Sequence, residues 1–440
     1  MIDHNVISIA PMIGWTDRHY RFLFRHIARC PVLYTEMIMD SAILHNLDCL
    51  DNFIGFDRQI EPPLALQLGG NNPETLGKAV EACEGYGGFS EINLNCGCPS
   101  NKAKRCGFGA ELMLEPDLVR QITSEMIRKS SSTEITVKCR IGTNVRNTWG
   151  DLLEFVHACR DGGVRKLIVH ARICVLCGLS PAQNRNVPPL RYDIVSRLVE
   201  SFPDMKFILN GGVRTYEETD QLLGYHYQEG EMTCNEMYTN TSIPQADTVD
   251  NALYDPLEVL SVPWTQQPST ATVARTAPES GVHTSDLSHT DHSLVSKPLP
   301  HSAAAVHGVM VGREAYNNPW YWANADKHYY HQSNPTYTRQ QTLDSYLTYA
   351  ATVLNSDMPR STIPYLCKPL HNFFTGSTGN KLYKRKLDNL LKVQVAHTAK
   401  FQSGHIVRTE GEDLGVIFDS IIREAVEETI PQEFLDTRSL

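Results

Sequence analysis

Two cysteines separated by one residue follow an apolar run in the segment INLNCGCPS, residues 92–100. Cys96 lies within the run, whereas Cys98 lies past its end, between a glycine and a proline. An ordinary thiol has a pKa of about 8.5, so it is mostly protonated at neutral pH and can serve as a general acid. The spacing predicts that Cys98 points into a pocket as a proton donor and that Cys96 fills space in the core.

A metal site is the alternative use of such thiols. Five cysteines are expected near the same side of the fold, namely Cys96, Cys98, Cys106, Cys174 and Cys177. Four thiolates can hold zinc or an iron–sulfur cluster, but such sites commonly use two C-x-x-C pairs, and this region has one. The sequence therefore favours a single working thiol, and no metal is expected.

Residues suited to ligand binding also stand at the ends of the other apolar runs. They are Pro11, Met12, Gln67, Asn95, Lys138, Arg140, His170, Asn210, Gly211, Gly212, Gly312 and Arg313. Glycines let backbone N–H groups approach phosphate oxygens, and Arg313 adds a fixed charge. Lys138 suits the electron-rich edge of a reduced flavin. Together these residues indicate FMN, with a sugar-phosphate substrate as the alternative.

A scaffold must bring these run ends together. Eight short runs rich in Val, Ile and Leu alternate with segments of helical period, and the runs cover residues 6–12, 32–37, 64–70, 91–97, 135–142, 167–172, 206–212 and 308–313. Eight strand–helix repeats predict an α/β fold, the parallel (β/α)8 or TIM barrel, in which chemistry lies at the C-terminal ends of the strands. An open doubly wound sheet is the alternative, and the count of eight favours the barrel.

The barrel domain is predicted to span residues 1–326, with one interruption. Residues 227–305, between the seventh helix and the eighth strand, are rich in Ser, Thr, Pro and His and show no sustained period. We expect them to form a disordered insert on the face opposite the chemistry. A small helical domain is predicted at 335–400, followed by an acidic extension at 401–440.

The charge is distributed unevenly along the chain. The formal net charge is −10, but residues 227–305 contribute −8 and residues 409–440 contribute −7, which leaves +5 for the remainder. Residues 360–400 alone carry +7, including Lys368, Lys381, Lys384, Arg385, Lys386 and Lys392. Because the Debye length is about 8 Å at physiological salt, a local patch matters more than the total. The helical domain is therefore predicted to bind nucleic acid, with a plain solvated helix face as the alternative.

Several segments, taken in order, resemble one enzyme family. They are APMIGWTDRHYR, YTEM, ALQLGG, EINLNCGCPS, VKCRIG, GLSPAQNRNVPPL, NGGV and GVMVGREAYNNP. These motifs are similar to those of the tRNA-dihydrouridine synthases, and WTDRHYR, GLSPAQNRNVPPL and EAYNNP point to the A branch of that family. The similarity covers residues 6–225 and 306–325 closely, and the helical domain more loosely. It implies a TIM-barrel flavoenzyme that binds FMN, is reduced by NADPH, and converts a D-loop uridine of tRNA at position 20 or 20a to 5,6-dihydrouridine.

The resemblance also implies roles for individual residues. The flavin contacts fall on Pro11, Met12, Ile13, Gln67, Lys138, His170, Asn210, Gly211, Gly212, Gly312 and Arg313. The catalytic acid falls on Cys98, which would give a proton to C5 of uracil after a hydride has added to C6. Asn95 and Arg185 would face the target base and its nucleotide, and Lys381, Lys384 and Arg385 would contact the tRNA. Two segments depart from the family pattern, NKAKRCGFGA at 101–110 and ICVLC at 173–177.

Two other functions stay open at this point. One is a flavin barrel that reduces a free pyrimidine or another small enone, although a small substrate needs no basic helical domain. The other is a non-catalytic tRNA-binding chaperone with a vestigial pocket. No apolar run approaches the ~20 residues that span a bilayer, and the N-terminus resembles no signal peptide. We therefore expect no membrane association and a cytoplasmic location, with a nuclear or organellar one left open.

Overall fold

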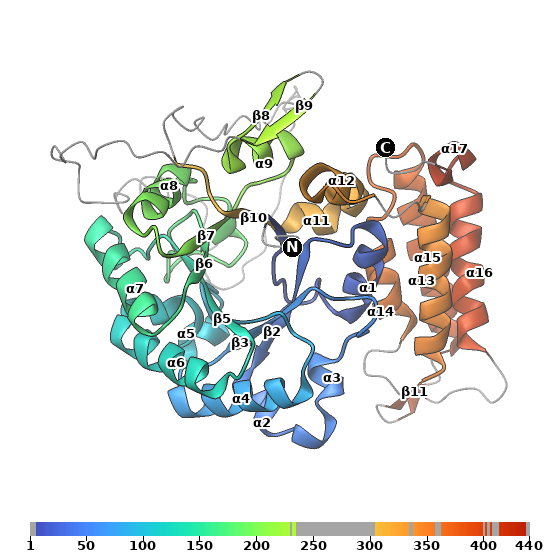
Figure 1. The fold of residues 1–440 in the computed structure, drawn as a ribbon. Helices are drawn as coiled ribbons and strands as arrows, with labels where there is room; N and C mark the ends of the chain where they lie inside the picture. The colour runs from blue at the N-terminus through green and yellow to red at the C-terminus, as the bar shows by residue number, and fades with distance from the viewer. Residues whose placement is uncertain are drawn as a thin grey trace, which may run out of the picture.

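The main body of the molecule is a closed barrel of eight parallel strands surrounded by helices, with further helices packed on one side (Figure 1). A computed structural model describes residues 6–228, 231–234, 304–333, 338–356, 362–398, 401–402, 405–406 and 413–436. Around the barrel the strands follow the order β1-β10-β7-β6-β5-β4-β3-β2. The predicted TIM barrel with additional helices is confirmed.

Each barrel strand coincides with one of the eight predicted apolar runs. The strands are β1 (Ile7–Ile9), β2 (Val32–Met39), β3 (Leu64–Gly69), β4 (Glu91–Cys96), β5 (Glu134–Arg140), β6 (Lys166–His170), β7 (Lys206–Asn210) and β10 (Gly308–Val311). Side chains alternate between the interior and the helices because the period of a strand is two residues. Tyr34, Ile168, Ile208 and Met310 pack together in one buried cluster, which Met12 partly covers.

The helices of the barrel begin where the sequence supplies capping residues. The longer ones are α1 (Arg18–Ile27), α4 (Pro73–Tyr86), α6 (Pro116–Lys129), α7 (Trp149–Asp161), α8 (Tyr192–Ser201) and α9 (Tyr216–Leu223). Shorter ones are α2 (Asp40–Leu44), α3 (Asp51–Ile54), α5 (Asn101–Arg105), α11 (Arg313–Asn317) and α12 (Ala325–Tyr330). Thr148 and Asp151 form a capping box at the start of α7, which satisfies backbone N–H groups that have no partner within the helix.

The predicted interruption begins directly after α9. There β8 (Tyr225–Gln228) and β9 (Glu231–Cys234) form an antiparallel pair outside the barrel. The remainder of the predicted insert, up to residue 303, lies outside the described residues. The chain returns where the backbone N–H of Val306 donates to the carbonyl of Leu222. Both attachment points therefore lie at the N-terminal ends of the strands, opposite the ends that carry the predicted site.

The helices beyond the barrel share one apolar core. They are α13 (Arg339–Leu354), α14 (Ile363–Leu370), α15 (Asn380–Thr398), α16 (Leu414–Glu427) and α17 (Gln432–Leu435), and a short strand pair, β11 (Phe401–Gln402) and β12 (His405–Ile406), follows α15. Phe22 and Leu23 of α1 join this core, so it is continuous with the barrel wall. We expected an acidic extension at 401–440, but within it Phe418 and Ile422 of α16 are buried in the same core. α16 is therefore structurally part of the helical domain.

Candidate active site at the barrel mouth

Lys138 and Asn210 meet inside the barrel near its C-terminal end. The Nζ of Lys138 donates to Oδ1 of Asn210 over 2.9 Å, and Nδ2 of Asn210 donates to the carbonyl of Met310 over 2.8 Å. Loss of hydration, and then the charge of Arg140, lowers the pKa of Lys138 to about 8. A desolvated ammonium group is costly unless a partner compensates for the lost water. This position therefore suits the electron-rich edge of a ligand.

Cationic groups gather around this point. They are Lys138, Arg140, Arg172, Arg185 and Arg313. His170 lies among them, and burial together with the charge of Arg140 holds its pKa well below its usual range. Within the described part of the chain none of the five forms an ion pair with a carboxylate, and the buried Nε of Arg172 has no hydrogen-bond partner. Like charges that have no counterions repel one another, and a bound anion reduces this repulsion. The cluster therefore fits a phosphate-bearing ligand.

The loop after β7 needs glycine at two successive positions. Gly211 has φ +115°, and a Cβ there would lie 2.5 Å from Cδ2 of His170. Gly212 has φ +79°, and a Cβ there would lie 2.5 Å from Cδ1 of Leu190. Across the neighbouring strand, a Cβ on Gly312 would meet no atom within 4 Å. The backbone of Gly312 is thus open beside Arg313, whereas side chains of the protein itself fill the space beside Gly211 and Gly212.

The turn that carries Cys98 is held by Asn95. The Oδ1 of Asn95 accepts hydrogen bonds from the backbone N–H groups of Gly97 (3.1 Å) and Cys98 (3.0 Å), and its Nδ2 donates to Oε1 of Gln67 (2.8 Å). Cys98 is half-buried, whereas Cys96 is fully buried, and burial raises the pKa of Cys96 well above its usual value. Asn95 was predicted to face the base, and the structure shows that it also fixes the turn that positions the thiol.

Gln67 is part of a hydrogen-bonded line through the barrel interior. Its Nε2 donates to Oδ1 of Asn93 over 2.8 Å, and Nδ2 of Asn93 donates to Oγ1 of Thr136 over 2.8 Å. Thr136 in turn donates to Glu91 over 2.5 Å, and Glu91 is ion-paired with Lys166 over 2.7 Å. These contacts fix which way the Gln67 amide faces at the barrel mouth.

Two arginines gain a role that the sequence did not indicate. Arg140 was noted at a strand end without an assigned role, and Arg172 was not predicted to join the site. Arg140 is 2% exposed and donates to three carbonyl oxygens, those of Gly97 (3.2 Å), Ile173 (2.9 Å) and Asn184 (2.9 Å). It therefore ties the Cys98 turn to the loop that carries Arg185, which ends the short 3-10 helix Gln183–Arg185. Each of the two arginines stands two residues after a predicted flavin contact, and this period-two spacing was the signal that could have revealed their roles.

The loop after β1 presents its residues in two directions. Met12 packs over the interior cluster of the barrel, and its backbone N–H donates to Oγ1 of Thr16 over 2.9 Å. Pro11, before it, is half-buried. The side chain of Ile13 points outward and is 64% exposed. The flavin contact of Met12 stays a prediction, and a contact of Ile13 would use its backbone.

Comparison with known proteins adds an independent finding. The family model described as Dihydrouridine synthase (Dus) matches residues 8–269 and 299–405. This chain belongs to the dihydrouridine synthase family. A tRNA-dihydrouridine(20/20a) synthase of Synechocystis is 31% identical, over 88% of this chain and 89% of that protein. Synthases of the same name from Pseudomonas putida and Pseudomonas aeruginosa are 45% and 42% identical, over 53% and 56% of this chain and 67% and 72% of theirs.

Membership of the dihydrouridine synthase family confirms the resemblance that the motifs indicated. It also confirms the predicted class, because dihydrouridine synthases are flavin-dependent oxidoreductases. The cationic cluster, the paired glycines and the unpartnered Nε of Arg172 are a donor set that fits a flavin phosphate. The roles of the individual residues stay predictions.

The basic residues of α15 in this family member differ in their partners. Lys381 and Arg385 are exposed on α15, and no ion pair of theirs lies within the described residues. Lys384 donates to Oδ1 of Asn372 over 2.7 Å. Lys386, counted with the basic surface, instead lies 3.0 Å from Oε1 of Glu424 and also pairs with Glu428, both near the end of α16. The charges of Lys381 and Arg385 are thus exposed and not neutralised by a described carboxylate.

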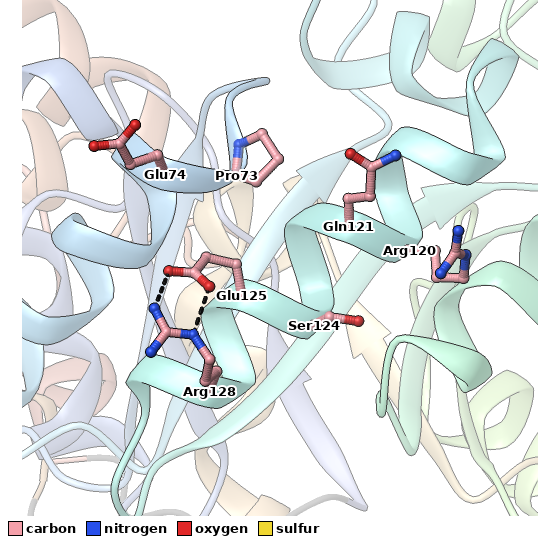
Figure 2. A pocket seen from close by; sticks show the side chains of 7 residues that line it. All are labelled: Pro73, Glu74, Arg120, Gln121, Ser124, Glu125 and Arg128. Carbon is pink, nitrogen blue, oxygen red and sulfur yellow. Dashed lines mark hydrogen bonds and ion pairs between the residues drawn. The ribbon is translucent and has the colours of Figure 1, made fainter.

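Three further findings concern the rest of the described structure. The structure places no group of three or more His, Cys, Asp or Glu side chains of its described ranges where they could hold a metal ion. A hollow of about 530 Å³ lies between α4 and α6, where Figure 2 shows Glu125 paired with Arg128. It is on the outer wall of the barrel, not at the strand ends. In the same described ranges no helix is both long and apolar enough to cross a membrane.

Proposed function

We propose that this family member reduces a uridine at position 20 or 20a in the D-loop of tRNA to 5,6-dihydrouridine, with FMN as cofactor and NADPH as reductant. One observation carries the proposal. A half-buried thiol, Cys98, stands beside a cationic cluster that has no ion pair with a carboxylate in the described residues. The position in the tRNA is taken from relatives named tRNA-dihydrouridine(20/20a) synthase, one of which aligns with 88% of this chain.

The cluster supports FMN because this flavin carries one phosphate. Gly211, Gly212, Gly312 and Arg313 would hold that phosphate, and Lys138 would meet the pyrimidine edge of the ring. Bound FMN supplies the hydride that adds to C6 of uracil. Met12 covers the interior cluster of the barrel and would offer an apolar surface to the ring. Gln67, fixed by Asn93 and Asn95, would orient toward the polar edge of the ring.

Cys98 supplies the proton in this proposal. Addition of a hydride at C6 leaves negative charge on C5 and O4 of the base, and the thiol of Cys98 protonates C5. The proton must reach C5 from a fixed direction, so the position of the thiol matters as much as its acidity. Asn95 and Arg140 provide this fixed position through Gly97 and Cys98. Arg185, on the loop that Arg140 also holds, would contact the nucleotide.

The target base must leave the RNA stack before it can reach this thiol, because a stacked and paired base is not accessible inside a barrel. Folded tRNA then needs a second surface that holds its backbone. Lys381 and Arg385 on α15 would supply that surface through phosphate contacts, which bind without reading sequence.

A reconstituted reaction tests the proposal. The protein is supplied with FMN, NADPH and unmodified tRNA transcripts, and dihydrouridine is located by mass spectrometry of nuclease fragments. Dihydrouridine should appear at position 20 or 20a, and a transcript with cytidine at both positions should give none. Reduction of free uridine but not of tRNA would instead support a small-enone reductase. Binding of tRNA with no reduction of any uridine would support a chaperone.

A further inference from the structure

Exposed apolar side chains gather on one face of the barrel. Among the described residues, Ile13, Val145 and Val187 are exposed and lie in loops after the C-terminal ends of strands, whereas the exposed Leu47 and Phe53 lie in the 3-10 helix Leu47–Cys49 and in α3. The other exposed large apolar residues of these ranges, Leu382 and Val416, lie in the helical domain, and none lies on α4, α6, α7 or α8 of the barrel wall. Single exposed apolar residues are ordinary, but a concentration at one face marks an interaction surface.

Three of these residues lie in loops at the end of the barrel that carries the cationic cluster and are called the rim residues here: Ile13, Val145 and Val187. They are 64%, 66% and 41% exposed. Ile13 follows Met12, and Val187 comes two positions after Arg185. Val145 lies in the loop that follows β5, the strand of Lys138. The rim residues thus come from three separate loops, which follow β1, β5 and β6 at the end of the barrel that carries the cationic cluster.

The loops that carry the rim residues are held by hydrogen bonds. The backbone N–H of Gly14, next to Ile13, donates to Oε1 of Glu36 over 2.5 Å. The backbone N–H of Val145 donates to Oγ1 of Thr143 over 3.2 Å, and that of Val187 donates to the carbonyl of Gln183 over 2.8 Å. The side chains are therefore presented by built turns, so a partner can bury them without first ordering the chain.

We propose that the rim residues contact the faces of the nucleotides on either side of the uridine that enters the barrel. This inference rests on the proposed function. Extrusion of one base leaves its neighbours partly unstacked, and each exposed base face is apolar. The cationic cluster inside the rim complements the phosphates that link these nucleotides, which favours RNA over a protein partner. Aliphatic contact with a base face carries no charge, so its contribution to binding is insensitive to salt.

The affinity for tRNA at several salt concentrations tests the inference. The variant combines Ile13→Ser, Val145→Ser and Val187→Ser, and the control is Val416→Ser, which alters an equally exposed residue (65%) on α16. The rim variant should bind tRNA roughly tenfold more weakly, in line with the loss of contacts to one or two bases. The slope of log Kd against log salt should not change. The control should bind as the wild type does.

A second measurement identifies what the rim contacts. A transcript with abasic residues on both sides of the target uridine should bind more weakly to the wild type, and the difference between wild type and rim variant should disappear. A difference that persists with this transcript would overturn the inference, and so would wild-type affinity or a flattened salt slope in the rim variant. Persistence would point to an RNA contact elsewhere, and wild-type affinity in the rim variant would leave this surface to a protein partner. A wild-type enzyme that forms no dihydrouridine would refute the proposed function, which the rim measurements alone cannot do.

Discussion

Cys96 and Cys98 are identical residues two positions apart, yet the structure gives them opposite surroundings. Cys96 is enclosed by the core between β4 and the surrounding helices, whereas Cys98 begins a turn whose backbone N–H is fixed by Asn95. Proximity to a strand end predicted this difference correctly, since the apolar run ends between the two. The contacts of Asn95 and Arg140 that fix the turn could not be predicted, because they depend on which loops meet at the barrel mouth.

The first prediction separates these two thiols. Cys98→Ala should fold, bind flavin and accept a hydride from NADPH, but transfer to tRNA should slow by about 10²–10⁴-fold, the usual contribution of a general acid. Cys96→Ala should react normally and lose about 1 kcal/mol of unfolding free energy, because it removes a small buried group. Single-turnover oxidation of the reduced enzyme by tRNA measures the transfer rate of each variant. Chemical denaturation measures the unfolding free energy of Cys96→Ala. Unimpaired transfer in Cys98→Ala would assign the proton to another residue.

The second prediction concerns the pH dependence of stability through Lys138. Its pKa is about 8 in the folded protein without ligand and about 10.4 in an unfolded chain. Between these values the unfolded state binds more protons, so the contribution of Lys138 to the unfolding free energy rises with pH. Below pH 8 both states are protonated and the folded state carries the full cost of the desolvated charge.

Lys138→Met tests this sign, because it removes the charge and keeps most of the side-chain volume. Without flavin, the variant should be more stable than the wild type at pH 7, and the difference should shrink as pH rises from 8 to 10. Chemical denaturation at each pH gives the two unfolding free energies. A difference that is constant with pH would mean that Lys138 is not the titrating group. Flavin affinity should fall in the variant at all pH values.

At the scale of elements, the barrel was well predicted because two patterns in the sequence, the apolar runs of the strands and the helical period of the segments between them, indicated the same fold. Eight runs of strand character and the intervening segments of helical period each fell where the structure has a strand or a helix. The β8–β9 pair and α14 were not predicted, since Pro364 and Pro369 interrupt the helical pattern of the latter. The packing of α16 was also missed, because its net negative charge hid an apolar face that includes Phe418, Ile421 and Ile422.

The third prediction distinguishes the two groups of basic residues on α15. Replacing Lys381 and Arg385 by glutamine should weaken tRNA binding and flatten its salt dependence, by at most about 0.9 in the log–log slope for each lost phosphate contact. Lys386→Gln is the matched control on the same helix. It should leave the slope unchanged and lower thermal stability slightly, because Glu424 and Glu428 lose their partner. A flattened slope in the control instead would mean that Lys386 leaves α16 to meet RNA.

At the scale of the whole molecule, the site and the interruption occupy opposite ends of the barrel. The site lies at the C-terminal ends of the strands. The chain leaves the barrel after α9 and returns to it beside Leu222, at the opposite end. Replacing residues 235–303 by a short Gly/Ser linker should therefore leave flavin content and tRNA reduction nearly unchanged. Flavin absorbance and dihydrouridine yield measure the outcome. A shortened protein that folds and binds flavin but no longer reduces tRNA would show that this segment takes part in catalysis.

The position of β10 has a consequence for synthesis on the ribosome. β10 pairs with both β1 and β7, so it alone joins the first strand to the seventh. Nearly one hundred residues separate the end of β7 from the start of β10, and a ribosome needs about 5–20 s to add them at ~5–20 residues per second. During this interval β1 and β7 are unpaired edges of an open sheet, which are sites for association with other chains. Translation speed across the interruption thus sets how long the nascent barrel is exposed to aggregation, and slow translation there should increase its dependence on chaperones.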